Sequence, residues 1–129
     1  LGTSATIRSH AYEKTLKTLD PEVKVTEEAC PLFVPLVEEG IVQDPITELV
    51  ALRYLSGIKK AGIKTVILGC THYPVLKSDL AKVLGQDVTL VESGDVLSVQ
   101  LEDLFKTNTI QKASENSRDI RVCITDLTD

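Results

Sequence analysis

The chain has 129 residues, with 14 lysines and arginines against 19 aspartates and glutamates, which gives a formal net charge of −5 at neutral pH. The 43% of apolar residues and 26% of charged residues are ordinary for a globular protein and exclude a disordered one. Because no basic patch accompanies this acidic balance, we expect neither nucleic acid nor an anionic membrane surface as a partner.

The chain opens on Leu1 and contains no methionine, so we expect a fragment of a longer protein or a processed chain. No apolar run approaches the roughly 20 residues of a membrane span, and no signal-peptide pattern is present. The cysteines, Cys30, Cys70 and Cys123, are widely spaced and form no CxxC pair. We therefore expect no metal site and a reduced, cytoplasmic protein.

In chain order, helical periodicity and short β-rich runs alternate. After Gly2, apolar residues on one face predict a helix that Pro21 closes, with Thr3 or Ser4 as its N-cap. Residues 23–26 then predict a strand.

The middle of the chain repeats this pattern. Asp44 as N-cap and Pro45 at the first helical position predict a helix that ends at Ala61-Gly62. Its expected buried side steps by three residues: Ile46, Leu49, Leu52, Leu55 and Ile58. Residues 65–68 form a continuous apolar run, typical of a buried parallel strand.

A third helix is predicted from near Pro74, with Leu76, Leu80, Val83 and Leu84 inside. Residues 88–91 predict another buried strand. After residues 93–95, a fourth helix is predicted, with Leu97, Leu101, Leu104 and Phe105 on one stripe. A polar surface loop over 106–118 and a last strand over 120–124 complete the pattern. This alternation predicts the α/β class, with an open parallel sheet and helices on both faces.

Chemistry concentrates at the end of the 65–68 strand, because ligands of such sheets bind beyond the carboxyl ends of the strands. Gly69 permits a sharp turn, and Cys70 then lies near unpaired N–H groups and a helix start, which favour a thiolate. Thr71 suits a carboxylate ligand, and His72 is able to exchange a proton with the thiol.

From spacing alone, a catalytic role and a packing role for Cys70 and His72 are equally open. Cys30 and Cys123 are expected in the core, since an isolated cysteine usually packs as a small apolar residue.

Four segments resemble the glutamate racemases. Residues 69–74 read GCTHYP, as in that family's signature, and residues 2–7 are similar to its GTxAT segment. Residues 29–38 match its ACPLFVPLVE stretch, and residues 91–94 resemble its VDSG. The four occur in the family's order.

The resemblance implies racemisation of glutamate by two cysteines without a cofactor or a metal. Cys70 would be one of the two catalytic bases, assisted by His72, and Glu38 falls where the family has a carboxylate near that histidine. Thr71 and His72 would contact substrate, and Thr3 and Thr6 would line the pocket.

The resemblance also implies an organisation into two lobes. Residues 1–92 would form the second α/β lobe, and residues 93–129 would return to complete a first lobe that is mostly outside this chain. The second catalytic cysteine belongs to that absent part, so we expect this chain alone to be inactive. The complete enzyme would be a cytoplasmic homodimer that supplies D-glutamate for peptidoglycan.

Two alternatives remain open. Another amino-acid racemase of the same superfamily shares the fold and the paired cysteines, although residues 72–74 favour glutamate. A non-catalytic binding domain on this fold is the alternative from a different class of protein.

Overall fold

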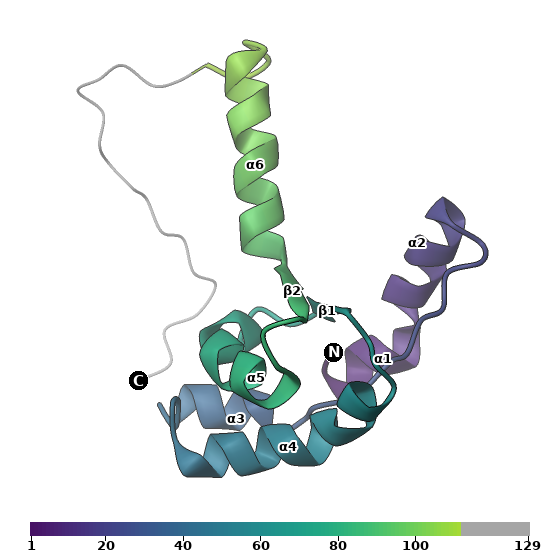
Figure 1. Ribbon diagram of the computed structural model, residues 1–129. Coiled ribbons are helices and arrows are strands. Elements are labelled where there is room, and N and C mark those ends of the chain that lie inside the picture. Colours follow the sequence, from purple (N-terminus) through teal and green to yellow (C-terminus); the bar gives the residue numbers. More distant parts are fainter. Residues whose placement is uncertain (112–129) are drawn as a thin grey trace. The chain divides into compact units, whose positions relative to one another are not determined.

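The computed structural model describes residues 1–111 (Figure 1). By its contacts the chain divides into two units, Leu1–Leu97 and Ser98–Asp129, and the account below concerns the first. The elements are α1 (Ser4–Ser9), α2 (Ala11–Leu19), α3 (Phe33–Glu38), α4 (Pro45–Lys60), β1 (Thr65–Leu68), the 3₁₀ helix η1 (Tyr73–Leu76), α5 (Lys77–Leu84), β2 (Thr89–Glu92) and α6 (Ser93–Lys106).

The sheet is parallel. β1 pairs with β2 from Thr65 opposite Thr89 to Leu68 opposite Glu92. On the other side of β1, the Leu1 nitrogen donates to the Ile67 carbonyl at 2.8 Å, and the Gly69 N–H donates to the Leu1 carbonyl at 2.8 Å. A parallel bridge between Gly2 and Ala29 adds one more extended segment. The predicted α/β class with a parallel sheet is confirmed.

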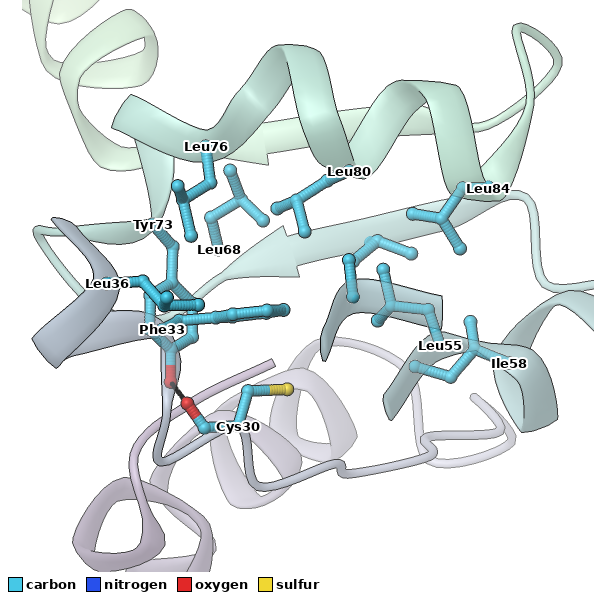
Figure 2. Close-up of a cluster of buried hydrophobic side chains, with 12 residues drawn as sticks. Cys30, Phe33, Leu36, Leu55, Ile58, Leu68, Tyr73, Leu76, Leu80 and Leu84 are labelled. Atoms are coloured by element: carbon cyan, nitrogen blue, oxygen red, sulfur yellow. Dashed lines mark hydrogen bonds between the residues drawn. The ribbon is translucent and has the colours of Figure 1, made fainter. Parts of the chain in front are cut away.

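The apolar core fills the space between the sheet and the helices α3, α4 and α5 (Figure 2). Phe33 and Tyr73 are fully buried and meet edge to face, with ring centroids 5.2 Å apart. The Tyr73 hydroxyl donates to the Cys30 carbonyl at 2.9 Å. This buried hydrogen bond ties the start of η1 to the segment that leads into α3.

Helix α4 begins as the sequence predicts. The Asp44 carboxylate accepts from the Ile46 N–H at 2.8 Å, and Pro45 occupies the first turn. Its buried side consists of Thr47, Ala51, Leu55 and Ile58. The expected three-residue stripe is therefore only partly right. Each three-residue step falls about 60° short of a full turn, so five such positions cannot share one face.

The first three residues of the predicted stripe are exposed: Ile46, Leu49 and Leu52 retain 55%, 67% and 50% of their accessible surface.

The predicted strand over residues 23–26 is wrong, because the structure has no strand there. Backbone pairing with a neighbour defines a strand, and among the described residues none pairs with this segment. The predicted first helix is split in two at His10. This residue has a φ of 52°, in the left-handed region, and its N–H donates to the Ile7 carbonyl, which ends α1.

Two further differences concern helix boundaries. The six-residue helix α3 was not predicted, and α6 begins at Ser93, directly after β2, instead of after residues 93–95. The predicted strand over 120–124 and most of the predicted loop over 106–118 lie outside the described residues. Within residues 1–111, every helix is too short or too polar to cross a bilayer.

Candidate active site

Gly69 places the candidate site at the end of β1. A Cβ atom at this position would lie 2.7 Å from the Leu1 carbonyl oxygen and 2.8 Å from the Tyr12 ring. The φ of Gly69 lies outside the left-handed region, so the turn after β1 does not itself require glycine at this position. Glycine is needed because the neighbouring backbone and an aromatic ring approach it closely.

Three predicted site residues lie in one chain of contacts. The Cys70 Sγ lies 3.8 Å from the His72 Nδ1, and the His72 Nε2 lies 3.4 Å from the Glu38 Oε1. Glu38 is the last residue of α3, so a carboxylate 34 residues before the histidine reaches its far ring nitrogen. About a third of the His72 side chain is exposed, and Cys70 is half-buried, which leaves both groups accessible to a ligand.

The two threonines lie on the neighbouring segment. Thr3 is the N-cap of α1, where its Oγ1 accepts from the Thr6 N–H at 3.2 Å and lies 3.0 Å from the Thr6 Oγ1. Because Leu1 is hydrogen-bonded to Gly69, Thr3 and Cys70 follow adjacent extended segments at the same edge of the sheet. Thr71 is exposed on the turn after Cys70.

The expected helix dipole behind Cys70 is weaker than predicted. The segment after His72 begins as the 3₁₀ helix η1, and the α-helix α5 begins only at Lys77. Because a helix dipole acts over about the first turn, it contributes little at a residue seven positions earlier. The histidine and the local N–H groups are the remaining partners for a thiolate.

Cys30 is fully buried in the core, as expected from its sequence context. Burial raises the pKa of its thiol to about 12, although the nearby N-terminal amine opposes this increase. A thiol of this kind is neutral and unreactive at neutral pH. Cys123 lies outside the described residues.

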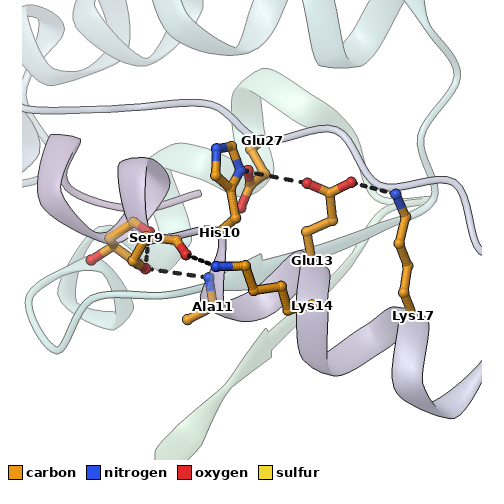
Figure 3. A network of polar contacts seen from close by, with 8 residues as sticks. Ser9, His10, Ala11, Glu13, Lys14, Lys17 and Glu27 are labelled. Atoms are coloured by element: carbon orange, nitrogen blue, oxygen red, sulfur yellow. Dashed lines mark hydrogen bonds and ion pairs between the residues drawn. The ribbon is translucent and has the colours of Figure 1, made fainter.

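A polar network around His10, at the start of α2, was not predicted from the sequence (Figure 3). The His10 Nδ1 lies 2.5 Å from a carboxylate oxygen of Glu27, and Glu13 bridges His10 and Lys17. Lys17 lowers the pKa of Glu13 through a hydrogen bond and its charge. The Glu13–Lys17 and His10–Glu13 pairs have helical spacings of four and three residues, which predict contact. The His10–Glu27 contact joins residues 17 apart, which no local spacing predicts.

A second missed network fixes the end of β2. The Lys77 ammonium contacts Glu92 at 2.6 Å and Asp95 at 3.0 Å. These hydrogen bonds raise the pKa of Lys77 and lower that of Asp95. They link the first turn of α5 to the junction between β2 and α6, and so hold in place the helix that follows the candidate site.

Comparison with curated proteins gives high similarity to glutamate racemases. The chain is 50% identical over 95 residues to the glutamate racemase of Geobacter metallireducens, which covers 74% of this chain and 35% of that protein. It is 36% identical over 127 residues to that of Chlorobaculum parvum, which covers 98% of this chain and 47% of that protein. The chain thus spans less than half the length of these relatives. No protein-family model matches it.

Solved structures give the same result. The glutamate racemase of Francisella tularensis in complex with D-glutamate superposes with a TM-score of 0.76 at 39% identity, over 89% of this chain and 44% of that one. The racemase from Thermus thermophilus in complex with β-chloro-D-alanine has a TM-score of 0.68 at 39% identity, over 84% of this chain and 39% of that one. The resemblance predicted from the four motifs is confirmed.

Proposed function

We propose that the complete protein racemises glutamate without a cofactor, and that this chain supplies one wall of its active site. The similarity to glutamate racemases, one of them solved with D-glutamate, supports the substrate. The observation that carries the proposal is the Cys70–His72–Glu38 chain of contacts at the end of β1. It joins a half-exposed thiol to an imidazole whose other nitrogen contacts a carboxylate.

Cys70 is the base on one face of the substrate. Its thiolate takes the α-hydrogen of glutamate as a proton, and the electron pair of the broken C–H bond passes into the α-carboxylate. An acid on the opposite face then protonates the α-carbon with inverted configuration. In the reverse direction Cys70, now a thiol, returns the proton.

His72 and Glu38 assist this thiol. A carboxylate at 3.4 Å orients the imidazole and stabilises its protonated form, and an imidazolium beside Sγ stabilises the thiolate. Thr71, His72, Thr3 and Thr6 are the proposed substrate contacts. Their hydroxyl groups and the N–H groups of the turn suit the carboxylates of glutamate and the charge that develops on deprotonation.

The second thiol is proposed to come from a part of the protein outside this chain. Cys30 does not suit the role, because it is fully buried. Under this proposal residues 1–92 form the second of two α/β lobes, and residues 93–129 return to complete the first. The relatives, which are more than twice as long as their matched segments, are large enough for two such lobes.

We further propose that the enzyme is a cytoplasmic homodimer whose product, D-glutamate, enters peptidoglycan and so supports cell shape. Neither a nucleic acid nor a membrane is required for this role. Racemisation of another amino acid is the alternative within the superfamily, and binding without catalysis is the alternative outside it.

Racemisation assays of the complete protein test the proposal. Cys70→Ser should lower kcat in both directions by at least about a thousandfold, because a hydroxyl is far less acidic than a thiol. Cys30→Ala, which removes a thiol from the core, is the matched control and should retain most activity in the folded fraction. Unchanged activity of Cys70→Ser would refute the role of this thiol, and activity on aspartate but not glutamate would refute the substrate.

A further inference from the structure

His72 and Tyr73 are neighbours in the chain and contact opposite ends of helix α3. The His72 Nε2 lies 3.4 Å from the Oε1 of Glu38, which is the last residue of α3. The Tyr73 hydroxyl donates at 2.9 Å to the carbonyl of Cys30, three residues before α3 begins. Two adjacent residues at the candidate site therefore hold this helix at its two ends.

Tyr73 holds the start of α3 from inside the core (Figure 2). Its side chain is fully buried, and its ring meets that of Phe33, the first residue of α3, edge to face at 5.2 Å. Burial raises the pKa of the Tyr73 hydroxyl, so this group keeps its proton and remains a donor at neutral and moderately alkaline pH. A directional hydrogen bond and a close-packed ring thus fix the start of the helix.

The far end of α3 is held less firmly. Glu38 is exposed, with 61% of its side-chain surface accessible, and its contact of 3.4 Å with His72 is longer than an ordinary hydrogen bond. Leu36 also packs into the core, but apolar contacts are non-directional and do not fix the tilt of a short helix. The Glu38–His72 contact is therefore sensitive to how the start of α3 is oriented.

The length of α3 shows how small a change matters. At a rise of about 1.5 Å per residue, Glu38 lies about 7.5 Å along the helix from Phe33, so a tilt of about 5° displaces it by roughly 0.6 Å. A displacement of that size away from His72 takes the two side chains out of hydrogen-bonding range.

We propose that Tyr73 is a positioning residue of the candidate active site, which orients α3 through Cys30 and Phe33 so that Glu38 reaches His72. This inference rests on the proposed function, in which the Glu38 carboxylate acts on the thiol through the imidazole. Because Tyr73 is fully buried, it acts through Glu38 and not on the substrate. Loss of its hydroxyl should change the same kinetic quantities as loss of the Glu38 charge, by a smaller amount.

Tyr73→Phe in the complete protein tests this role. The variant keeps the ring, and the Cys30 carbonyl still accepts from the Phe33 N–H at 3.2 Å, so the fold should persist. We expect kcat to fall about three- to tenfold, with less than about a twofold change in KM, and its pH dependence to change in the same direction as in Glu38→Gln. In the Glu38→Gln background the same substitution should lower kcat less than about twofold, because the contact it serves is already lost.

Tyr54→Phe is the matched control. The Tyr54 ring also meets Phe33 edge to face, at 5.4 Å, but its hydroxyl accepts only a marginal bond of 3.4 Å from the Leu32 N–H. This variant should keep the kcat of the wild type and its pH dependence. Circular dichroism and the urea midpoint of each variant establish the folded fraction to which kcat refers.

Equal losses of kcat on Tyr73→Phe in the wild-type and Glu38→Gln backgrounds would overturn the proposal, since Tyr73 would then act independently of Glu38. So would an unchanged pH dependence in Tyr73→Phe, or an equal loss in Tyr54→Phe, which would indicate a general loosening of the core. Cys70→Ser separates this inference from the proposed function. Full activity of Cys70→Ser would refute the proposed function, whereas its inactivity together with additive effects of Tyr73→Phe and Glu38→Gln would refute the positioning role alone.

Discussion

At the scale of single residues, the two free cysteines of the described chain differ in their surroundings. Cys70 is half-buried beside an imidazole, whereas Cys30 is enclosed by the core. Both residues follow the end of an extended segment, so position along the chain does not separate them. The GCTHYP motif separates them from the sequence, and burial separates them in the structure.

Stability should fall at alkaline pH because of buried acids. Burial raises the pKa of Cys30 to about 12 and also raises that of Tyr73. The unfolded thiol loses its proton near pH 8.5, so above this pH the unfolded state binds fewer protons and gains stability relative to the folded state. The free energy of unfolding should therefore decrease steadily from about pH 8.5 upward.

Chemical denaturation across pH 7–10.5 measures this decrease. Cys30→Ala should flatten the decrease just above pH 8.5, where the thiol titrates first. An unchanged slope in this variant would show that folding does not raise the pKa of the Cys30 thiol.

Replacement of Glu38 tests the contact with His72. Glu38→Gln keeps the size of the side chain but removes the charge 3.4 Å from Nε2. In the complete protein we expect kcat to fall about ten- to a hundredfold and its pH dependence to change, with a smaller effect on KM. The exposed neighbour Glu39 offers the control, and Glu39→Gln should leave both unchanged. A change confined to KM would make Glu38 a binding residue.

Gly69 should tolerate no side chain. In Gly69→Ala the new methyl would meet the Leu1 carbonyl oxygen at 2.7 Å, and backbone cannot yield as a flexible side chain does. We expect a loss of about 2–3 kcal/mol in unfolding free energy. Gly57→Ala is the control: no atom lies within 4 Å of its Cβ position, and in the interior of α4 it should gain about 0.5–1 kcal/mol. Equal effects would contradict the close approach at Gly69.

At the scale of elements, the features predicted correctly are those that depend on residues close together in the chain, such as helix caps and short apolar runs. Asp44 and Pro45 mark the start of α4 by capping alone, and β1 stands out as an apolar run because Val66 and Leu68 are buried. β2 was also predicted as a buried strand, but none of its residues is buried. Residues 23–26 have the β-rich composition of a strand, yet pairing depends on a neighbour that composition does not reveal. The short helix α3 contains Pro35 and spans under two turns, too few for a periodicity to be recognised.

The candidate site was predictable only in part, for the same reason. The proximity of Cys70 and His72 follows from two positions of separation, but the Glu38–His72 contact depends on how α3 packs against η1. From sequence, only the resemblance to a known family suggested that contact. The family resemblance did not point to the networks around His10 and Lys77, so they were not predicted.

At the scale of the whole molecule, residues 1–129 alone should not racemise glutamate. Inversion needs a proton donor on each face of the α-carbon, and the described chain offers one accessible thiol. The chain should also self-associate, because α6 carries exposed apolar side chains: Val96, Leu97, Val99, Leu101 and Leu104. Assays with both enantiomers and a solution mass measure this. A monomer that racemises glutamate would contradict the assignment of the second thiol.

The exchange of the α-hydrogen in D₂O tests the role of Cys70 in the complete protein most directly. Each enantiomer presents its α-hydrogen to a different base, so loss of one thiol should affect the two unequally. We predict that Cys70→Ser loses deuterium incorporation into one enantiomer by at least about a thousandfold while residual exchange persists in the other. Wild-type exchange of both enantiomers in this variant, with the fold intact, would contradict the account.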